Sequence, residues 1–168
     1  VRHRQGRNRE SGTPAHALFA EARRNTQLTR VFFYHNAPDR IAATAALIGK
    51  AFAQRKALLV FAPDAELAAA LDRHLWMVPP TGFIPHVAVN SPLATETPVL
   101  IADTLDAVPH DERLFNLSAE VPPGFSRFAS LIEVVGQDRD ERVDGRRRAR
   151  FYKDRGYDIS YVDLSGQG

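Results

Sequence analysis

Residues 31–61 decide the fold of this chain, and they read VFFYHNAPDRIAATAALIGKAFAQRKALLVF. The first four residues are β-branched or aromatic, which predicts a strand. Residues 39–54 carry apolar side chains at helical spacing, and Asn36 or Asp39 can cap this helix. Residues 57–61 form a continuous apolar run, which is typical of a buried parallel strand. The order strand, helix, strand predicts right-handed crossovers and an α/β fold with an open, mostly parallel sheet.

The sequence that follows extends this pattern. Asp64 can cap a second helix, and a Pro-rich stretch over residues 79–98 predicts irregular backbone. A charged helix is expected over residues 139–155, and Gly156 is suited to end it. Further strands are expected at residues 99–102, 113–117, 131–135 and 157–162, with a helical turn at residues 126–128.

Composition indicates one compact domain. The chain has 168 residues, of which 44% are hydrophobic, and that is enough for a single core. It has no cysteine, which excludes disulfides and thiolate chemistry and fits a cytoplasmic location. No apolar run approaches the roughly 20 residues of a membrane span, and the N-terminus lacks the apolar core of a secretory signal. We therefore expect no association with a membrane.

The charge of the chain is concentrated at its N-terminus. Residues 1–27 contain six Arg and two Glu, so they carry a net charge of +4, whereas the remaining 141 residues sum to −2. Three interpretations compete for this segment: a basic arm for nucleic acid, a disordered tail, or an extension from an upstream start codon. The tail and the extension are favoured, and Val at position 1 suits the extension. The α/β domain is expected to span residues 28–168.

The patterns of common catalytic and nucleotide sites are missing. The loop after the first strand, residues 35–39, has no glycine and contains Pro38, so it cannot wrap a pyrophosphate in the usual way. The six histidines are scattered, and Asp103 with Asp106 is weak support for a Mg²⁺ site. Glu133 lies inside an apolar strand, where it needs a partner, and arginine is favoured over a catalytic role. We expect no enzyme activity, no cofactor and no metal.

Two features favour recognition. Arg142, Arg146 and Arg150 follow one another at four-residue spacing and form a stripe along the charged helix. This stripe is either a solvated basic face or a site for phosphate or carboxylate groups. Trp76 and Phe83 flank a Pro-rich break, where large aromatic side chains either fill the core or anchor an interface. The residues alone slightly favour the core.

Several segments together resemble a known family. They are TRVFFYHNAPD (29–39), LLVFAPDAELAAALDRHLW (58–76), FIPH (83–86), PLATETPVLI (92–101), LFNLSAEVPPGFSRFASLIEVVGQD (114–138) and FYKDRGYDIS (151–160). The similarity runs from about Thr29 to Leu164, and in these segments the chain resembles the chi subunits of bacterial DNA polymerase III.

The resemblance implies a binding role without catalysis. It implies a single Rossmann-like domain that lacks a nucleotide-binding loop. The implied partners are the psi subunit of the clamp loader and the acidic C-terminal tail of the single-stranded DNA-binding protein, which ends in an aromatic residue with a free carboxylate. The association with single-stranded DNA is then indirect. Direct binding of single-stranded nucleic acid is the alternative function, although the net acidic body and the few aromatic residues among the arginines disfavour it.

The resemblance also implies which residues bind each partner. The tail site corresponds to Arg142, Arg146 and Arg150, with Tyr152 on the same helix and Val135 just before it. An aromatic residue is expected before Arg150, but Ala149 stands there, so this pocket is expected to differ in shape. The psi-binding surface corresponds to Trp76 and Phe83.

Overall fold

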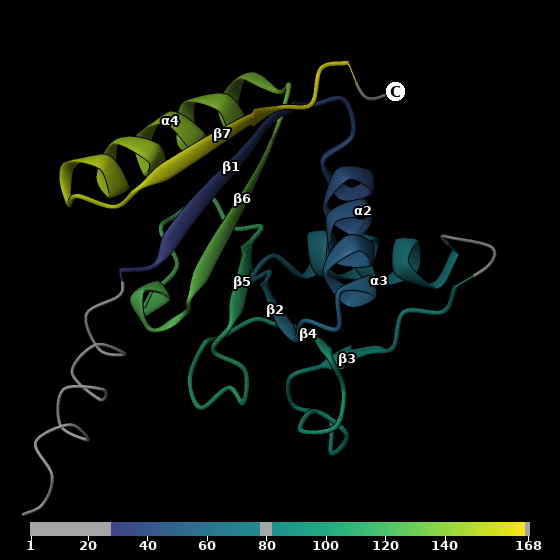
Figure 1. Ribbon diagram of the computed structural model, residues 1–168. Helices are drawn as coiled ribbons and strands as arrows, with labels where there is room; N and C mark the ends of the chain where they lie inside the picture. The colour runs from purple at the N-terminus through teal and green to yellow at the C-terminus, as the bar shows by residue number, and fades with distance from the viewer. Residues whose placement is uncertain (1–27, 78–81, 167–168) are drawn as a thin grey trace, which may run out of the picture.

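The computed structural model describes residues 28–77 and 82–166. The predicted N-terminal extension, residues 1–27, lies outside the described residues. Within them, seven strands form one sheet in the order β3-β4-β2-β5-β6-β1-β7, and every pairing between neighbours is parallel (Figure 1). The strands are β1 (Arg30–Ala37), β2 (Leu58–Phe61), β3 (His86–Ala88), β4 (Val99–Ala102), β5 (Arg113–Asn116), β6 (Ser130–Gly136) and β7 (Ile159–Asp163).

Helices cover both faces of this sheet. The helices α2 (Arg40–Ala53) and α3 (Ala65–Met77) pack together over one apolar cluster, which includes Ile48, Leu71 and Val134. The helix α4 (Arg139–Asp154) covers a second cluster on the other face, together with the 3₁₀ turn η1 (Phe125–Arg127). In Figure 1, α4 lies beside β7 and β1, well away from α2 and α3. The predicted α/β fold with an open parallel sheet is confirmed.

The predicted helix ends are also confirmed. The Asp39 carboxylate accepts a hydrogen bond from the Ala42 amide at 3.0 Å, and the Asp64 carboxylate accepts one from the Glu66 amide at 2.9 Å. Gly156 follows α4 with a φ of +82°, a left-handed conformation that glycine adopts without steric cost. These local interactions fix where each helix begins or ends.

One strand was not predicted. β3 has three residues and lies at the edge of the sheet, between prolines. Such a short run offers no periodic pattern, and its strand conformation depends on pairing with β4.

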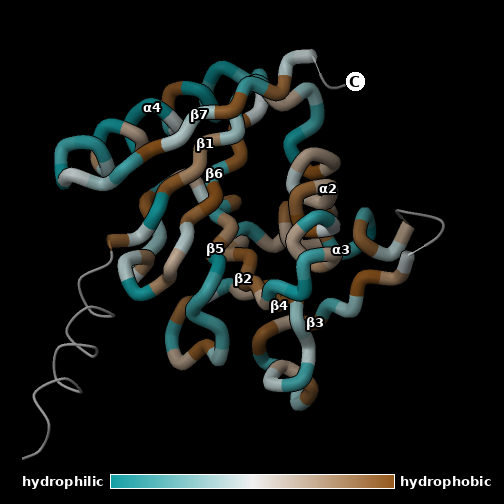
Figure 2. The backbone as a smooth tube through the Cα atoms, viewed as in Figure 1, coloured by the Kyte–Doolittle hydropathy of each residue, from teal (hydrophilic) through white to brown (hydrophobic). Residues whose placement is uncertain are grey.

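Figure 2 shows the distribution of hydropathy that made the other elements predictable. Apolar residues concentrate in the strands and in α2, while α4 is mostly hydrophilic.

The described residues contain no helix with the length and apolar character needed to span a membrane. The same residues contain no group of three or more His, Cys, Asp or Glu side chains arranged to hold a metal ion.

Candidate functional site

A pocket of about 280 Å³ lies between α4 and the strands β1, β6 and β7. We call it the α4 pocket. It brings together three of the residues predicted to bind the acidic tail, Val135, Arg142 and Arg146, with Ala149 beside them. Its other lining residues are Phe33, His35, Asn36, Gly145 and Tyr161. The pocket thus combines apolar and aromatic walls with two cationic side chains.

Close packing of α4 on the sheet forms the pocket floor. Gly145 faces β6, and a Cβ at this position would meet Val135 Cγ2 at 3.0 Å and Cγ1 at 3.2 Å. A larger residue would therefore push the helix away from the strand or displace Val135. Because Gly145 and Ala149 are both small, the space above Val135 stays open.

The arginines of α4 differ in their partners. Arg142 and Arg146 are exposed, and within residues 28–77 and 82–166 neither forms an ion pair or a side-chain hydrogen bond. Arg147, in contrast, lies 2.9 Å from Glu120 and 3.2 Å from Asp144. Arg142 and Arg146 therefore line the α4 pocket with guanidinium donors that remain open to an anionic ligand.

Two further predicted tail-binding residues do not line the pocket. Arg150 is highly exposed, and its Nε lies 3.8 Å from the Asp154 carboxylate. Tyr152 is fully buried, and its hydroxyl donates a 2.7 Å hydrogen bond to Glu133 Oε1. Burial, together with the negative charge of Glu133, raises the pKa of Tyr152 far above its usual range. Tyr152 thus supports α4 from beneath, and a direct contact with a ligand stays a prediction for both residues.

The sequence prediction missed Tyr161, which lines the α4 pocket from β7. A signal for it was present, since alternation along a strand places Tyr161 on the same face as Ile159, which packs in the cluster beneath α4. The parallel register of β1 and β7 pairs Tyr161 with Phe33. That pairing joins segments more than 120 residues apart, so the local pattern did not reveal it.

The buried Glu133 has the arginine partner that the sequence predicted. Arg148 Nε and Nη2 each lie 3.0 Å from Glu133 Oε2. Oε1 accepts hydrogen bonds from Asn116 Nδ2 at 3.0 Å and from the Tyr152 hydroxyl. Among the described residues, no buried side-chain nitrogen or oxygen lacks a partner. The carboxylate is thus fully occupied by the fold, which supports a structural role.

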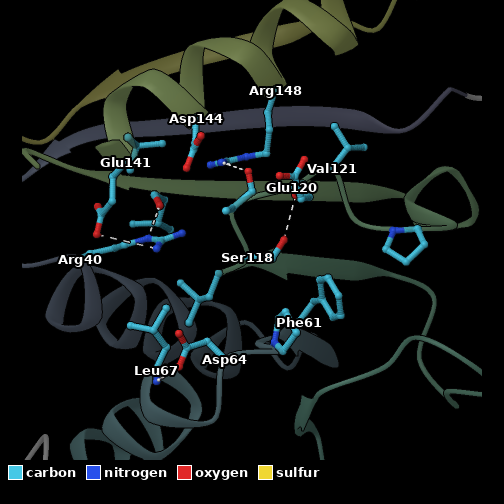
Figure 3. Close-up of a pocket in the computed structure, with 16 residues that line it drawn as sticks. Arg40, Phe61, Asp64, Leu67, Ser118, Glu120, Val121, Glu141, Asp144 and Arg148 are labelled. Carbon is cyan, nitrogen blue, oxygen red and sulfur yellow. Dashed lines mark hydrogen bonds and ion pairs between the residues drawn. The ribbon is translucent and has the colours of Figure 1, made fainter. Parts of the chain in front are cut away.

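A cavity of about 650 Å³ lies beside this network, at the carboxyl ends of β2, β5 and β6 (Figure 3). Arg40 lines it, and its Nε donates a 2.8 Å hydrogen bond to the Val134 carbonyl. Burial lowers the pKa of Arg40, and the nearby carboxylate of Glu141 opposes that shift. Glu141 itself accepts a 2.8 Å hydrogen bond from the Gly136 amide. The charged groups of this cavity therefore mostly hold α2, β6 and α4 together.

The two residues predicted to bind psi lie side by side on the surface. Trp76 is 61% exposed and Phe83 is 59% exposed, with their ring centroids 5.2 Å apart. Met77, 70% exposed, follows Trp76, and we call these three residues the Trp76 patch. The interpretation of Trp76 and Phe83 as core residues is wrong, because most of each side chain contacts solvent. Exposed aromatic clusters of this kind mark interaction surfaces.

Comparison with known proteins gives two matches. A family model described as "DNA polymerase III chi subunit, HolC" matches residues 28–160. The DNA polymerase III subunit chi of Pseudomonas aeruginosa is 28% identical over 136 residues, which cover 79% of this chain and 94% of that protein. The residues matched by the family model include Arg142, Arg146 and the three residues of the Trp76 patch.

Proposed function

The chain belongs to the family of DNA polymerase III chi subunits, and from this premise we propose that it is a non-catalytic bridging subunit of the holoenzyme. One surface binds the psi subunit of the clamp loader, and another binds the acidic C-terminal tail of the single-stranded DNA-binding protein. Association with single-stranded DNA is then indirect, and the protein acts in the bacterial cytoplasm. The observation that carries the proposal is the α4 pocket with its two open arginines.

The chemistry of the α4 pocket suits a peptide end. Arg142 and Arg146 offer planar guanidinium donors that match a carboxylate, and their side chains have no competing partner among the described residues. Val135 and the aromatic lining offer apolar contact beside those charges. An acidic tail that ends in an aromatic residue with a free carboxylate needs both kinds of contact.

The Trp76 patch suits a protein partner of a different kind. It presents three large apolar side chains with no compensating charge among them. Burial of such a patch stabilises a complex through the hydrophobic effect, which is insensitive to moderate salt. We assign this surface to the psi subunit.

Bridging would follow from two separate contacts on one rigid domain. Each contact is modest by itself, but tethering raises the local concentration of the second partner. The clamp loader would thus be retained near single strands that are coated with their binding protein. No covalent chemistry is required for this role.

The tail assignment is tested by isothermal titration calorimetry with the C-terminal peptide of the organism's own single-stranded DNA-binding protein. We expect binding that weakens as salt rises. Arg146→Ala should weaken it by about tenfold or more, which is the effect of losing one charged hydrogen-bond partner. The matched control is Arg147→Ala, which removes the same charge from the same helix but outside the pocket. The control should change affinity by no more than about twofold.

Equal losses in Arg146→Ala and Arg147→Ala would contradict a localised site and indicate a general charge effect. Absence of peptide binding by the wild-type protein, with tight binding to a bare oligonucleotide, would favour the alternative of a direct single-stranded nucleic-acid-binding protein.

The psi assignment is tested by Trp76→Ala and Phe83→Ala in titrations with purified psi. Because both side chains are exposed, the variants should fold with unchanged thermal stability. We expect each to weaken psi binding by about 2 kcal/mol or more, as for aromatic anchors at an interface. Tail binding should be retained. Unchanged psi affinity in both folded variants would overturn the assignment.

A further inference from the structure

The wall of the α4 pocket on its β7 side is Tyr161. This side chain is 59% exposed, although it lies on the sheet face that α4 covers. Ala149 lines the same pocket from the helix, and its side chain is a single methyl group. A large side chain at position 149 would compete with a ligand for the space near Tyr161. The chain therefore combines a small residue on the helix with an aromatic residue on the strand.

Two aromatic neighbours hold Tyr161 in place. Its ring centroid lies 5.8 Å from that of the buried Phe33, and 6.3 Å from that of His35 in an edge-on arrangement. Both neighbours belong to β1, which pairs in register with β7. Rings at these separations attract one another, so Tyr161 is positioned before any ligand binds.

The size of the α4 pocket limits what it can hold. Its volume of about 280 Å³ lies just below the usual range for ligand pockets, roughly 300–1,000 Å³. One aromatic side chain with its adjoining carboxylate suits this volume better than a nucleotide with its sugar and phosphate. The guanidinium groups of Arg142 and Arg146 supply donors at the same site.

We infer that Tyr161 is a specificity-determining residue of this pocket: the terminal aromatic side chain of an acidic peptide packs against Tyr161, while its free carboxylate binds Arg142 and Arg146. This inference rests on the proposed function. It names a contact on β7, whereas the family resemblance implied an aromatic residue on the helix, at the position of Ala149. The aromatic wall of the pocket is thus contributed by the strand in this chain.

The test is a double-mutant cycle measured by calorimetry on the full chain. The probes are two short acidic peptides that differ only in the last residue, phenylalanine or alanine, each with a free carboxylate. Tyr161→Ala should weaken binding of the phenylalanine peptide about tenfold, as expected for loss of an aromatic contact with its buried area. For the alanine peptide the effect should be no more than about twofold. Tyr161→Phe keeps the ring and should retain affinity.

Two controls separate recognition from structure. Leu93→Ala removes a similarly exposed apolar side chain, 55% exposed, that belongs to neither proposed surface, and it should leave peptide binding unchanged. In the Tyr161→Ala background, adding Ala149→Tyr returns an aromatic ring to the same pocket and should restore part of the lost affinity.

Each result of these titrations either supports or overturns the inference about Tyr161. If Tyr161→Ala binds the phenylalanine peptide like the wild type while Arg146→Ala loses it, the inference is wrong and the proposed function stands. Equal weakening of both peptides would also overturn it, since Tyr161 would then shape the pocket without contacting the last side chain. If the wild-type protein binds neither peptide, the inference and the proposed function both fail.

Discussion

The side chains of α4 have two different roles, since some contact the buried core and others line the α4 pocket at the surface. Arg148 and Tyr152 point inward, where both contact the buried carboxylate of Glu133. Arg142 and Arg146 line the α4 pocket. Two of its arginines have acidic partners from other parts of the chain, Arg147 with Glu120 and Arg148 with Glu133, and these pairs offset the repulsion between like charges along the helix.

Tyr152 provides the first prediction. Tyr152→Phe removes one of the two donors to Glu133 Oε1 and should lower the free energy of unfolding by about 1–3 kcal/mol, because the donor served a buried charge. Denaturation in urea measures this change. Binding of the acidic peptide should stay within about twofold of the wild type, since the hydroxyl has no exposed surface. A selective loss of peptide binding in the folded variant would instead make Tyr152 a direct contact.

At the scale of elements, α4 is the part on which the proposed tail site depends. Its N-terminus is capped by Asp138, whose carboxylate accepts hydrogen bonds from the Asp140 amide at 2.9 Å and the Glu141 amide at 3.3 Å. Acidic residues in the first turn and Lys153 in the last turn oppose the helix dipole. Gly156 then ends the helix and allows the chain to return as β7, which completes the pocket.

The cap provides the second prediction. Asp138→Ala should lower the free energy of unfolding by about 1 kcal/mol, because two amides of the first turn lose their acceptor. Asp140→Ala removes the same charge two residues further along the chain and leaves the cap in place. It should cost only about 0.3 kcal/mol through the helix dipole. Urea denaturation of both variants measures the difference, and equal costs would show that charge and not capping sets the stability of this helix end.

At the scale of the whole molecule, the two proposed surfaces lie toward opposite edges of the sheet. The Trp76 patch adjoins β3, since the ring centroids of Trp76 and His86 lie 5.1 Å apart. The α4 pocket is lined by Tyr161 of β7. β3 and β7 are the two edge strands of the seven. Adjacent strands lie about 4.8 Å apart, so roughly 29 Å of sheet separates the two edges. From this separation we expect that the two proposed partners can be bound at the same time.

This separation provides the third prediction. Saturation with psi should change the affinity for the acidic peptide by less than about twofold, because no shared element contacts both sites. Raising the salt concentration should weaken peptide binding while psi binding changes little. Calorimetric titrations of the binary and ternary mixtures measure both effects. Mutually exclusive binding would place the two partners on one surface and contradict the bridging arrangement.

Local sequence signals were enough to predict most of the fold. Apolar periodicity and the caps at Asp39 and Asp64 predicted the three helices and six of the seven strands among the described residues, because these signals arise between residues close together in the chain. The exception, β3, is a short edge strand whose conformation depends on β4. The arginine stripe was likewise visible in the spacing of α4.

Which arginines of α4 are open to a ligand depends on tertiary contacts. Glu133 and Glu120 come from other parts of the chain, and they occupy Arg148 and Arg147. The aromatic wall of the α4 pocket was also decided by tertiary structure, because Tyr161 reaches the pocket through the pairing of β7 with β1. Contacts between distant segments leave no periodic trace in a single sequence, so the elements were predictable while the composition of the pocket was not.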